Sequence, residues 1–167
     1  MSNVQYAIPG SRLAQEYHSL QSELEPAIAR VLQRGAYCPD AEVRAFEREF
    51  ASYIGVRHAV AVNAGSAALL LSLMALGIEP GDEVISVPNV DISVSAPITH
   101  AGARVAWADI DPRTYNLDPA GLEEVITART RAIVAVHMYG NPADMASILT
   151  IAEAHGLPVV EDAALAP

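Results

Sequence analysis

The chain has 167 residues, of which 51% are hydrophobic, so it is long and apolar enough to bury a core. Its formal net charge of −10 at pH 7 argues against nucleic acid or an anionic membrane as its main partner. No apolar run is long enough to span a bilayer, and the N-terminus lacks the basic start and apolar core of a secretory signal. The single cysteine, Cys38, has no partner for an internal disulfide, which is typical of a cytoplasmic protein.

Two amphipathic helices are predicted in the first third of the chain. Apolar side chains recur at helical spacing over residues 11–34. Pro26 is expected to kink this helix or to divide it in two. A second helix is predicted to begin near Asp40, a suitable N-cap, and to be closed by Gly55. We expect residues 1–40 to form a helical arm that packs on the body of the protein or on a partner.

A strand, a turn of small residues and a helix follow one another over residues 58–76. The apolar run 58–62 has the length and composition of a strand, and it leads through Asn63 into an Ala/Leu-rich helical run. Free backbone N–H groups at the start of a helix, together with the helix dipole, favour an anion such as phosphate. Gly65 lets the backbone approach a ligand closely, and the Ser66 hydroxyl adds a donor. Alternatively, Asn63 or Ser66 merely caps the helix.

The rest of the chain alternates strands and helices. Strands are predicted at residues 83–87, 104–108, 131–137 and 157–160. Helices are predicted at residues 92–101, 118–127 and 144–155. Pro97 counts against the middle of the first of these helices, whereas Asp118 and Asp144 are suitable N-caps for the other two. The side of the last helix that faces the core is expected to carry Met145, Ile148, Leu149 and Ala152.

Apolar strands without alternation, separated by amphipathic helices, indicate a three-layer α/β/α fold with a mainly parallel sheet that is covered on both faces. In such sheets, ligands bind beyond the carboxyl ends of the strands. The Gly65–Ser66 turn and Asp162 are both expected at that edge. The sequence therefore predicts a shared site that contains both.

The other polar candidates have structural interpretations. The histidines are scattered without metal-ligand spacing, so no metal site is predicted; they are His18, His58, His100, His137 and His155. His137 ends a strand and is interpreted as a packed or turn-bonding residue. Asp109 and Asp111 belong to turn chemistry, and the pair Tyr115–Asn116 is interpreted as mostly structural. Ser66 lacks the pattern of a nucleophile elbow.

Seven short motifs occur in a fixed order along the chain. They are FEREFA (46–51), AGSAAL (64–69), GDEVI (81–85), AGA (101–103), DIDPRTYN (109–116), HMYG (137–140) and EDAA (161–164). Each is weak alone. Together, from about residue 12 to the last residue, they resemble the pyridoxal-phosphate-dependent DegT/DnrJ/EryC1/StrS aminotransferases, which aminate keto-sugars and related cyclic ketones.

The resemblance implies the fold of aspartate aminotransferase (fold type I), with residues 41–167 as the N-terminal portion of the large, pyridoxal 5'-phosphate-binding domain and the small domain absent. It implies a homodimer, a keto-sugar substrate and an amino-acid donor. Gly65 and Ser66 match the turn that holds the cofactor phosphate, and Asp162 matches the carboxylate that pairs with the ring nitrogen. Such a carboxylate favours the protonated ring, which is the better electron sink. Taken alone, Asp162 would be interpreted as capping the following turn.

Three departures from the family pattern concern the same site. All ten cationic residues are arginine, so no catalytic Schiff-base lysine is present; in the family it follows the Glu-Asp motif, and we expect this chain alone to be inactive. The stretch PNVDI (88–92) places Ile92, with a one-residue gap, where the family has an aromatic residue against the ring. Leu165 stands where the family has His or Gln, and it donates no hydrogen bond.

Four functions stay open. The first is an aminotransferase, of which this chain is the N-terminal portion. A dehydratase of the same family, with histidine in place of the lysine, is the second. The third is a non-catalytic, degenerate homologue that acts as a binding or regulatory module. A plain nucleotide-binding domain is the least supported, because no glycine-rich fingerprint is present. A parallel sheet that stops within a domain leaves an unpaired edge, so we expect the chain alone to aggregate or to pair.

Overall fold

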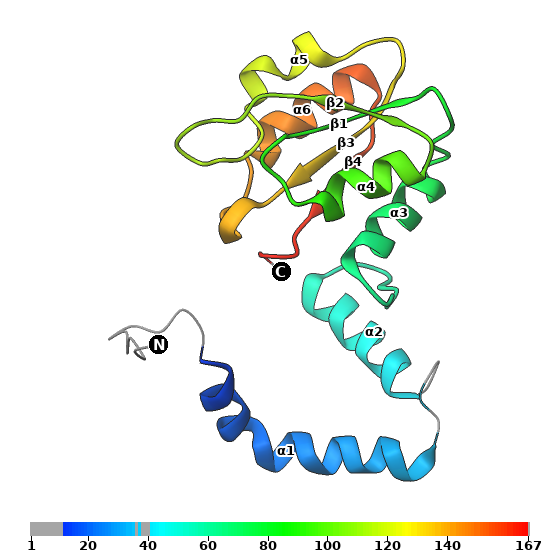
Figure 1. Ribbon diagram of the computed structural model, residues 1–167, viewed down its shortest axis with the longest axis vertical. Helices are drawn as coiled ribbons and strands as arrows, with labels where there is room; N and C mark the ends of the chain where they lie inside the picture. Colours follow the sequence, from blue (N-terminus) through cyan, green and yellow to red (C-terminus); the bar gives the residue numbers. More distant parts are fainter. Residues whose placement is uncertain (1–11, 36, 38–40, 167) are drawn as a thin grey trace, which may run out of the picture. The chain divides into compact units, whose positions relative to one another are not determined.

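The computed structural model describes residues 12–35, 37 and 41–166, and the chain forms two compact units, Met1–Ala61 and Val62–Pro167 (Figure 1). The predicted Asp40 N-cap and the single cysteine, Cys38, lie outside the described residues. No helix in the described part of the chain is long and apolar enough to cross a membrane.

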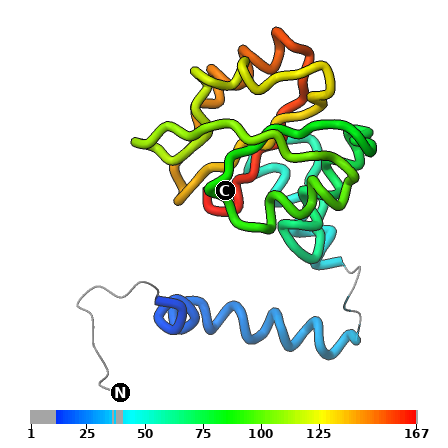
Figure 2. Tube along the Cα trace, turned by 45° about the horizontal axis from the view of Figure 1, so that its top comes forward, coloured from blue at the N-terminus to red at the C-terminus, as the bar shows by residue number. Residues whose placement is uncertain are grey.

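The first unit contains both predicted helices, α1 (Leu13–Arg34) and α2 (Ala41–Ile54). Helix α1 ends at Gly35, whose positive φ of 64° lets its N–H reach back to the carbonyl groups of the last turn. Pro26 does not divide α1, which is one helix and is bent in its N-terminal half (Figures 1 and 2). No residue of α1 is buried, and each apolar side chain of its predicted stripe is at least 39% exposed.

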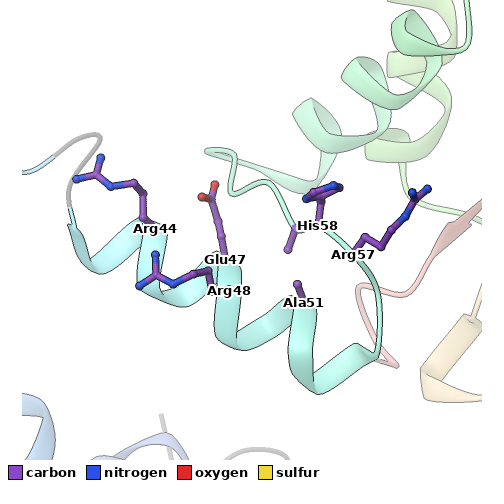
Figure 3. Close-up of a pocket in the computed structure, with 7 residues that line it drawn as sticks. Arg44, Glu47, Arg48, Ala51, Arg57 and His58 are labelled. Carbon is purple, nitrogen blue, oxygen red and sulfur yellow. The ribbon is translucent and has the colours of Figure 1, made fainter.

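The predicted strand at residues 58–62 is wrong. A strand needs a neighbouring strand for its backbone groups, and none of the described residues pairs with this segment. Instead, the Ala61 N–H donates to the Glu47 carboxylate of α2 at 2.9 Å, and Val60 is 78% exposed. Figure 3 shows Glu47 extending from α2 toward this segment. The strand-like composition was therefore not sufficient to form a strand here.

The second unit is built around a four-stranded parallel sheet with the strand order β2-β1-β3-β4. The strands are β1 (Glu83–Ser86), β2 (Arg104–Trp107), β3 (Thr130–Val136) and β4 (Val159–Asp162). The helices are α3 (Gly65–Ala75), α4 (Ile92–His100), α5 (Leu122–Val125) and α6 (Met145–His155), with short 3-10 helices η1 (Pro119–Gly121) and η2 (Met138–Gly140). These elements confirm the predicted mainly parallel α/β fold.

Alternate residues of the central strands enter two separate cores, one on each face of the sheet. Val84 and Val134 pack with α3 and α4, whereas Ile85 and Ile133 pack with α5 and α6. Figure 1 shows the two pairs of helices on opposite sides of the sheet, which gives three layers. The central strands β1 and β3 are buried on both faces, which explains their continuous apolar runs in the sequence.

Most predicted helix boundaries are also confirmed. Asp118 accepts a hydrogen bond from the Ala120 N–H, and Asp144 accepts one from the Ser147 N–H, as expected of N-caps. Pro97 lies inside α4 and is buried there. One core assignment is wrong: Leu149 is 41% exposed, because it lies on the outer side of α6, whereas Ile148 and Ala152 of that helix are buried.

Candidate functional site

The N-terminus of α3 carries no side-chain cap. Ala64 is the N-cap residue, in extended conformation, and no described side chain bonds to the cap, so neither Asn63 nor Ser66 fills that role. The first backbone N–H of this turn with an intrahelical partner is that of Ala68, which donates to the Ala64 carbonyl. The N–H groups ahead of it, at the positive end of the helix dipole, point out of the helix. This end of α3 is therefore suited to an anion.

Ser66 lines a hollow between α3 and α4 with a volume of about 450 Å³. Ala67 and Leu70 contribute from α3, and Ile92 and Ser93 contribute from the first turn of α4. The Ile92 side chain is 75% exposed, which leaves it available to a ligand rather than to the core. Gly65, next to Ser66, has open space around its α-carbon: an added β-carbon would meet no atom within 4 Å.

Asp162 and Leu165 line a second hollow, of about 220 Å³, at the carboxyl ends of β3 and β4. The first turn of α4 forms the opposite wall, where Asp91 and Ser93 lie. Ser93 lines both hollows, so the two meet at the start of α4. The structure thus brings Ser66, Ile92, Asp162 and Leu165 to one end of α4, on the face of the sheet that α3 and α4 cover.

One oxygen of the Asp162 carboxylate caps the turn that follows β4. Its Oδ1 accepts a hydrogen bond from the Ala164 N–H at 3.1 Å. No described residue bonds to Oδ2. The turn-capping interpretation is therefore confirmed for one oxygen, and the other oxygen is left for a ligand donor.

Sequence reasoning missed Asp91 and Ser93. The Ser93 N–H donates to Asp91 Oδ1 at 2.8 Å, which caps α4. Hydrogen bonds from the backbone and the hydroxyl of Ser93 lower the pKa of Asp91 below its ordinary value. An aspartate just ahead of a helical run is an N-cap signal, so Asp91 could have been found. The position of Ser93 between the two hollows depends on tertiary packing and has no sequence signal.

Asp111, Asn116 and His137 make the structural contacts predicted for them. Asp111 accepts hydrogen bonds from the backbone and guanidinium of Arg113. The buried Asn116 donates to the Asn141 carbonyl and accepts from the Met138 N–H. His137 is 6% exposed, and its Nδ1 accepts from the Ala143 N–H. Among the described residues, no group of three His, Cys, Asp or Glu side chains could hold a metal ion.

A charged hollow of about 270 Å³ in the first unit does not make a comparable site. Arg44, Arg48, Arg57 and His58 line it. Figure 3 shows that the guanidinium groups of Arg44 and Arg48 extend away from that of Arg57. Because these cations do not converge on one point, they do not form a pocket for a single anion.

Two curated relatives and one solved structure are similar to the chain. GDP-perosamine synthase of Caulobacter vibrioides is 54% identical over 120 residues, which are 71% of this chain and 32% of the relative. The dTDP-3-amino-3,4,6-trideoxy-alpha-D-glucose transaminase of Streptomyces venezuelae is 44% identical over 159 residues, 95% of this chain and 42% of the relative. The crystal structure of DesV from S. venezuelae in complex with a ketimine intermediate matches with a TM-score of 0.92 and 44% identity, over 95% of this chain and 43% of DesV.

The chain therefore spans less than half the length of these relatives. The model of the DegT/DnrJ/EryC1/StrS aminotransferase family matches residues 18–167. This match and the identity to the relatives confirm the resemblance seen in the seven motifs. The chain belongs to the DegT/DnrJ/EryC1/StrS aminotransferase family.

Proposed function

We propose that the chain forms the cofactor-binding part of a pyridoxal 5'-phosphate-dependent aminotransferase that transfers an amino group to a keto-sugar or a related cyclic ketone. The observation that carries this proposal is the pair of hollows that meet at Ser93. One contains Ser66 beside the uncapped end of α3, and the other contains Asp162 with one carboxylate oxygen unbonded among the described residues.

The residues fit the two ends of such a cofactor. The backbone N–H groups of the first turn of α3 and the Ser66 hydroxyl hold a phosphate through donors, so no cationic side chain is needed there. Asp162 Oδ2 would accept a hydrogen bond from the ring nitrogen and keep that nitrogen protonated. Ile92 offers an apolar surface to one face of a ring, and Leu165 offers no donor.

When bound, pyridoxal phosphate would supply an aldehyde carbon that takes up and releases the amino group and a ring that withdraws electrons from it. The part of the chain described above orients that ring. Ser66 and the start of α3 fix one end, and Asp162 fixes the charge state at the other. None of the 167 residues is lysine, so no lysine side chain of this stretch bonds to the cofactor.

The substrate and the assembly follow from the same proposal. The relatives named above are a GDP-perosamine synthase and a dTDP-sugar transaminase. By analogy, the acceptor is a keto-sugar and the donor an amino acid. The protein acts as a homodimer in the cytoplasm. The exposed apolar stripe of α1, which buries no residue in its own unit, supplies surface for such pairing.

Equilibrium dialysis of the chain against pyridoxal phosphate tests the proposal. The N-terminal amine is acetylated first, so that it does not react with the aldehyde. We expect saturable, non-covalent binding without a covalent absorbance band. Ser66→Ala and Asp162→Asn should weaken binding, whereas the matched controls Ser72→Ala on the same helix and Asp109→Asn in a turn should not.

Equal affinity of Asp162→Asn and the unsubstituted chain would contradict the proposed site. Absence of any saturable binding would favour the alternative that the chain is a non-catalytic homologue. Two departures support that candidate: Ile92 in place of an aromatic residue and Leu165 in place of a polar one.

A further inference from the structure

His137, the residue after β3, connects three segments of the chain. Its backbone N–H donates to the Asp162 carbonyl at 3.1 Å. Its Nδ1 accepts from the Ala143 N–H at 3.1 Å, and its Nε2 lies 3.2 Å from Glu161 Oε2. Because Nδ1 is an acceptor, the proton of the neutral ring is on Nε2, which therefore donates to Glu161.

Glu161 and Asp162 point to opposite faces of β4. Successive residues of a strand alternate between the two faces. Val159 packs in the core on the α5 and α6 side, and Val160 packs in the core on the α3 and α4 side. Glu161 therefore lies on the α5 and α6 side, which is also the side of Ala143, and Asp162 lies on the side of the proposed cofactor site.

Strand β4 ends beside His137, because β3 is its neighbour in the sheet. Among the described strands it pairs with β3 alone, where Val136 is the partner of Asp162. The bond between His137 and Glu161 joins the ends of β3 and β4 on the face away from the site.

We propose that His137 is a positioning residue, which fixes the direction of Asp162 by holding its neighbour Glu161 on the opposite face of β4. The inference rests on the proposed function, because it assigns the purpose of this arrangement to cofactor binding. His137 does not touch the cofactor. It acts through Glu161, and the Ala143 N–H holds the ring in the tautomer that donates to Glu161.

Glu161 provides the sharper test, because its side chain is 51% exposed and its loss should leave folding intact. Glu161→Ala removes the acceptor, whereas Glu161→Gln keeps a carbonyl oxygen for the Nε2 proton. Glu153→Ala, at an exposed position on α6, is the control. We expect Glu161→Ala to weaken pyridoxal phosphate binding about tenfold at an unchanged unfolding midpoint, and Glu161→Gln and Glu153→Ala to bind within about twofold of the unsubstituted chain.

Two substitutions of His137 each keep one of its two side-chain hydrogen bonds, to Glu161 or to the Ala143 N–H, and remove the other. In His137→Gln the amide N–H reaches Glu161 but leaves the Ala143 N–H without an acceptor. In His137→Asn the amide oxygen serves Ala143, but the side chain is too short for Glu161. We expect both to lower the unfolding midpoint to a similar extent, and only His137→Asn to weaken cofactor binding about tenfold. Equal binding by the two variants would reduce His137 to a structural residue.

An NMR measurement without ligand separates failure of this inference from failure of the proposed function. The carboxyl carbon signal of Asp162 should shift in Glu161→Ala and stay in place in Glu161→Gln. If it stays in place in both, His137 and Glu161 do not position Asp162, and the inference is overturned. If it shifts as expected while the unsubstituted chain binds no pyridoxal phosphate, the positioning stands and the proposed function fails.

Discussion

Ser66 and Asp162 lie on the same face of the sheet and line two hollows that share one residue, Ser93. They are 96 positions apart in the sequence, and the parallel sheet brings them together because α3 and β4 present their ligand-facing ends at one edge. Ser66 is beside free backbone N–H donors, and Asp162 is a hydrogen-bond acceptor. This polarity matches a ligand with an anionic end and a protonated end.

Asn116 holds two loops at the carboxyl edge of the sheet, and its loss should destabilise the fold. It is 1% exposed and bonds to both the Asn141 carbonyl and the Met138 N–H. Asn116→Ala leaves both groups unbonded, which should lower the free energy of unfolding in urea by about 2 kcal/mol or more. Asn141→Ala is the control, because Asn141 contributes only its backbone carbonyl to this bond. A change below about 0.5 kcal/mol in Asn116→Ala would show that water replaces both partners.

Glu83 should make stability depend on acid pH. The Thr127 hydroxyl, at 2.6 Å, and the Arg129 guanidinium, at 2.7 Å, lower the pKa of this buried carboxyl below its ordinary value of 4.5. A lowered pKa means that the stabilisation is present above the ordinary pKa and is lost as the pH falls through the lower, folded-state value. In Glu83→Gln the free energy of unfolding should therefore fall less steeply between about pH 5 and pH 3 than in the unsubstituted chain. Glu124→Gln, an exposed position, should keep the original slope.

Tyr139 adopts a backbone conformation that favours glycine. Its φ is 57°, and its ring, 74% exposed, rests edge-on against Tyr115. Tyr139→Gly should be more stable than Tyr139→Ala by about 1 kcal/mol, since alanine keeps the left-handed strain. At Phe46, an exposed position in the interior of α2, the order should reverse, because glycine weakens a helix interior. Finding alanine the more stable at both positions would rule out strain at Tyr139.

Leu165 marks a position where a hydrogen-bond donor should improve cofactor binding. Its side chain is 60% exposed and lines the same hollow as Asp162. Leu165→Gln should tighten pyridoxal phosphate binding about two- to tenfold, the contribution of one new hydrogen bond. The gain in affinity should vanish with an analogue of pyridoxal phosphate that lacks the ring hydroxyl, because the glutamine would then have no partner on the ring. Leu149→Gln on α6 should have no effect; an equal gain there would make the effect non-specific.

Much of the fold followed from local signals. The buried strands showed as apolar runs, and Asp118 and Asp144 marked the starts of helices because their side chains bond to the first turn. The segment 58–62 failed because composition does not reveal whether a partner strand is present. Leu149 was placed in the core by its spacing, although the face of α6 that packs on the sheet is centred on Ile148 and Ala152.

Only part of the candidate site could be predicted from the sequence. Ser66 and Asp162 were predicted from the rule that ligands bind at strand ends and from the resemblance to the family, and the structure places them in adjoining hollows. Ser93 was not predicted, because its place between the hollows is set by the packing of α4 against α3 and the sheet edge. The hydrogen bond between His137 and Glu161 also depends on the pairing of β3 with β4. No local sequence pattern indicates that these two strands are neighbours.

Binding of pyridoxine 5'-phosphate and of pyridoxine, its phosphate-free form, tests the central claim most directly. Neither has an aldehyde, so no amine reacts with them. If Ser66 and Asp162 hold opposite ends of one molecule, Ser66→Ala weakens binding of the phosphate form only, and Asp162→Asn weakens binding of both forms by a similar factor. Equal weakening of both ligands by Ser66→Ala, or no weakening of either by Asp162→Asn, would contradict the account.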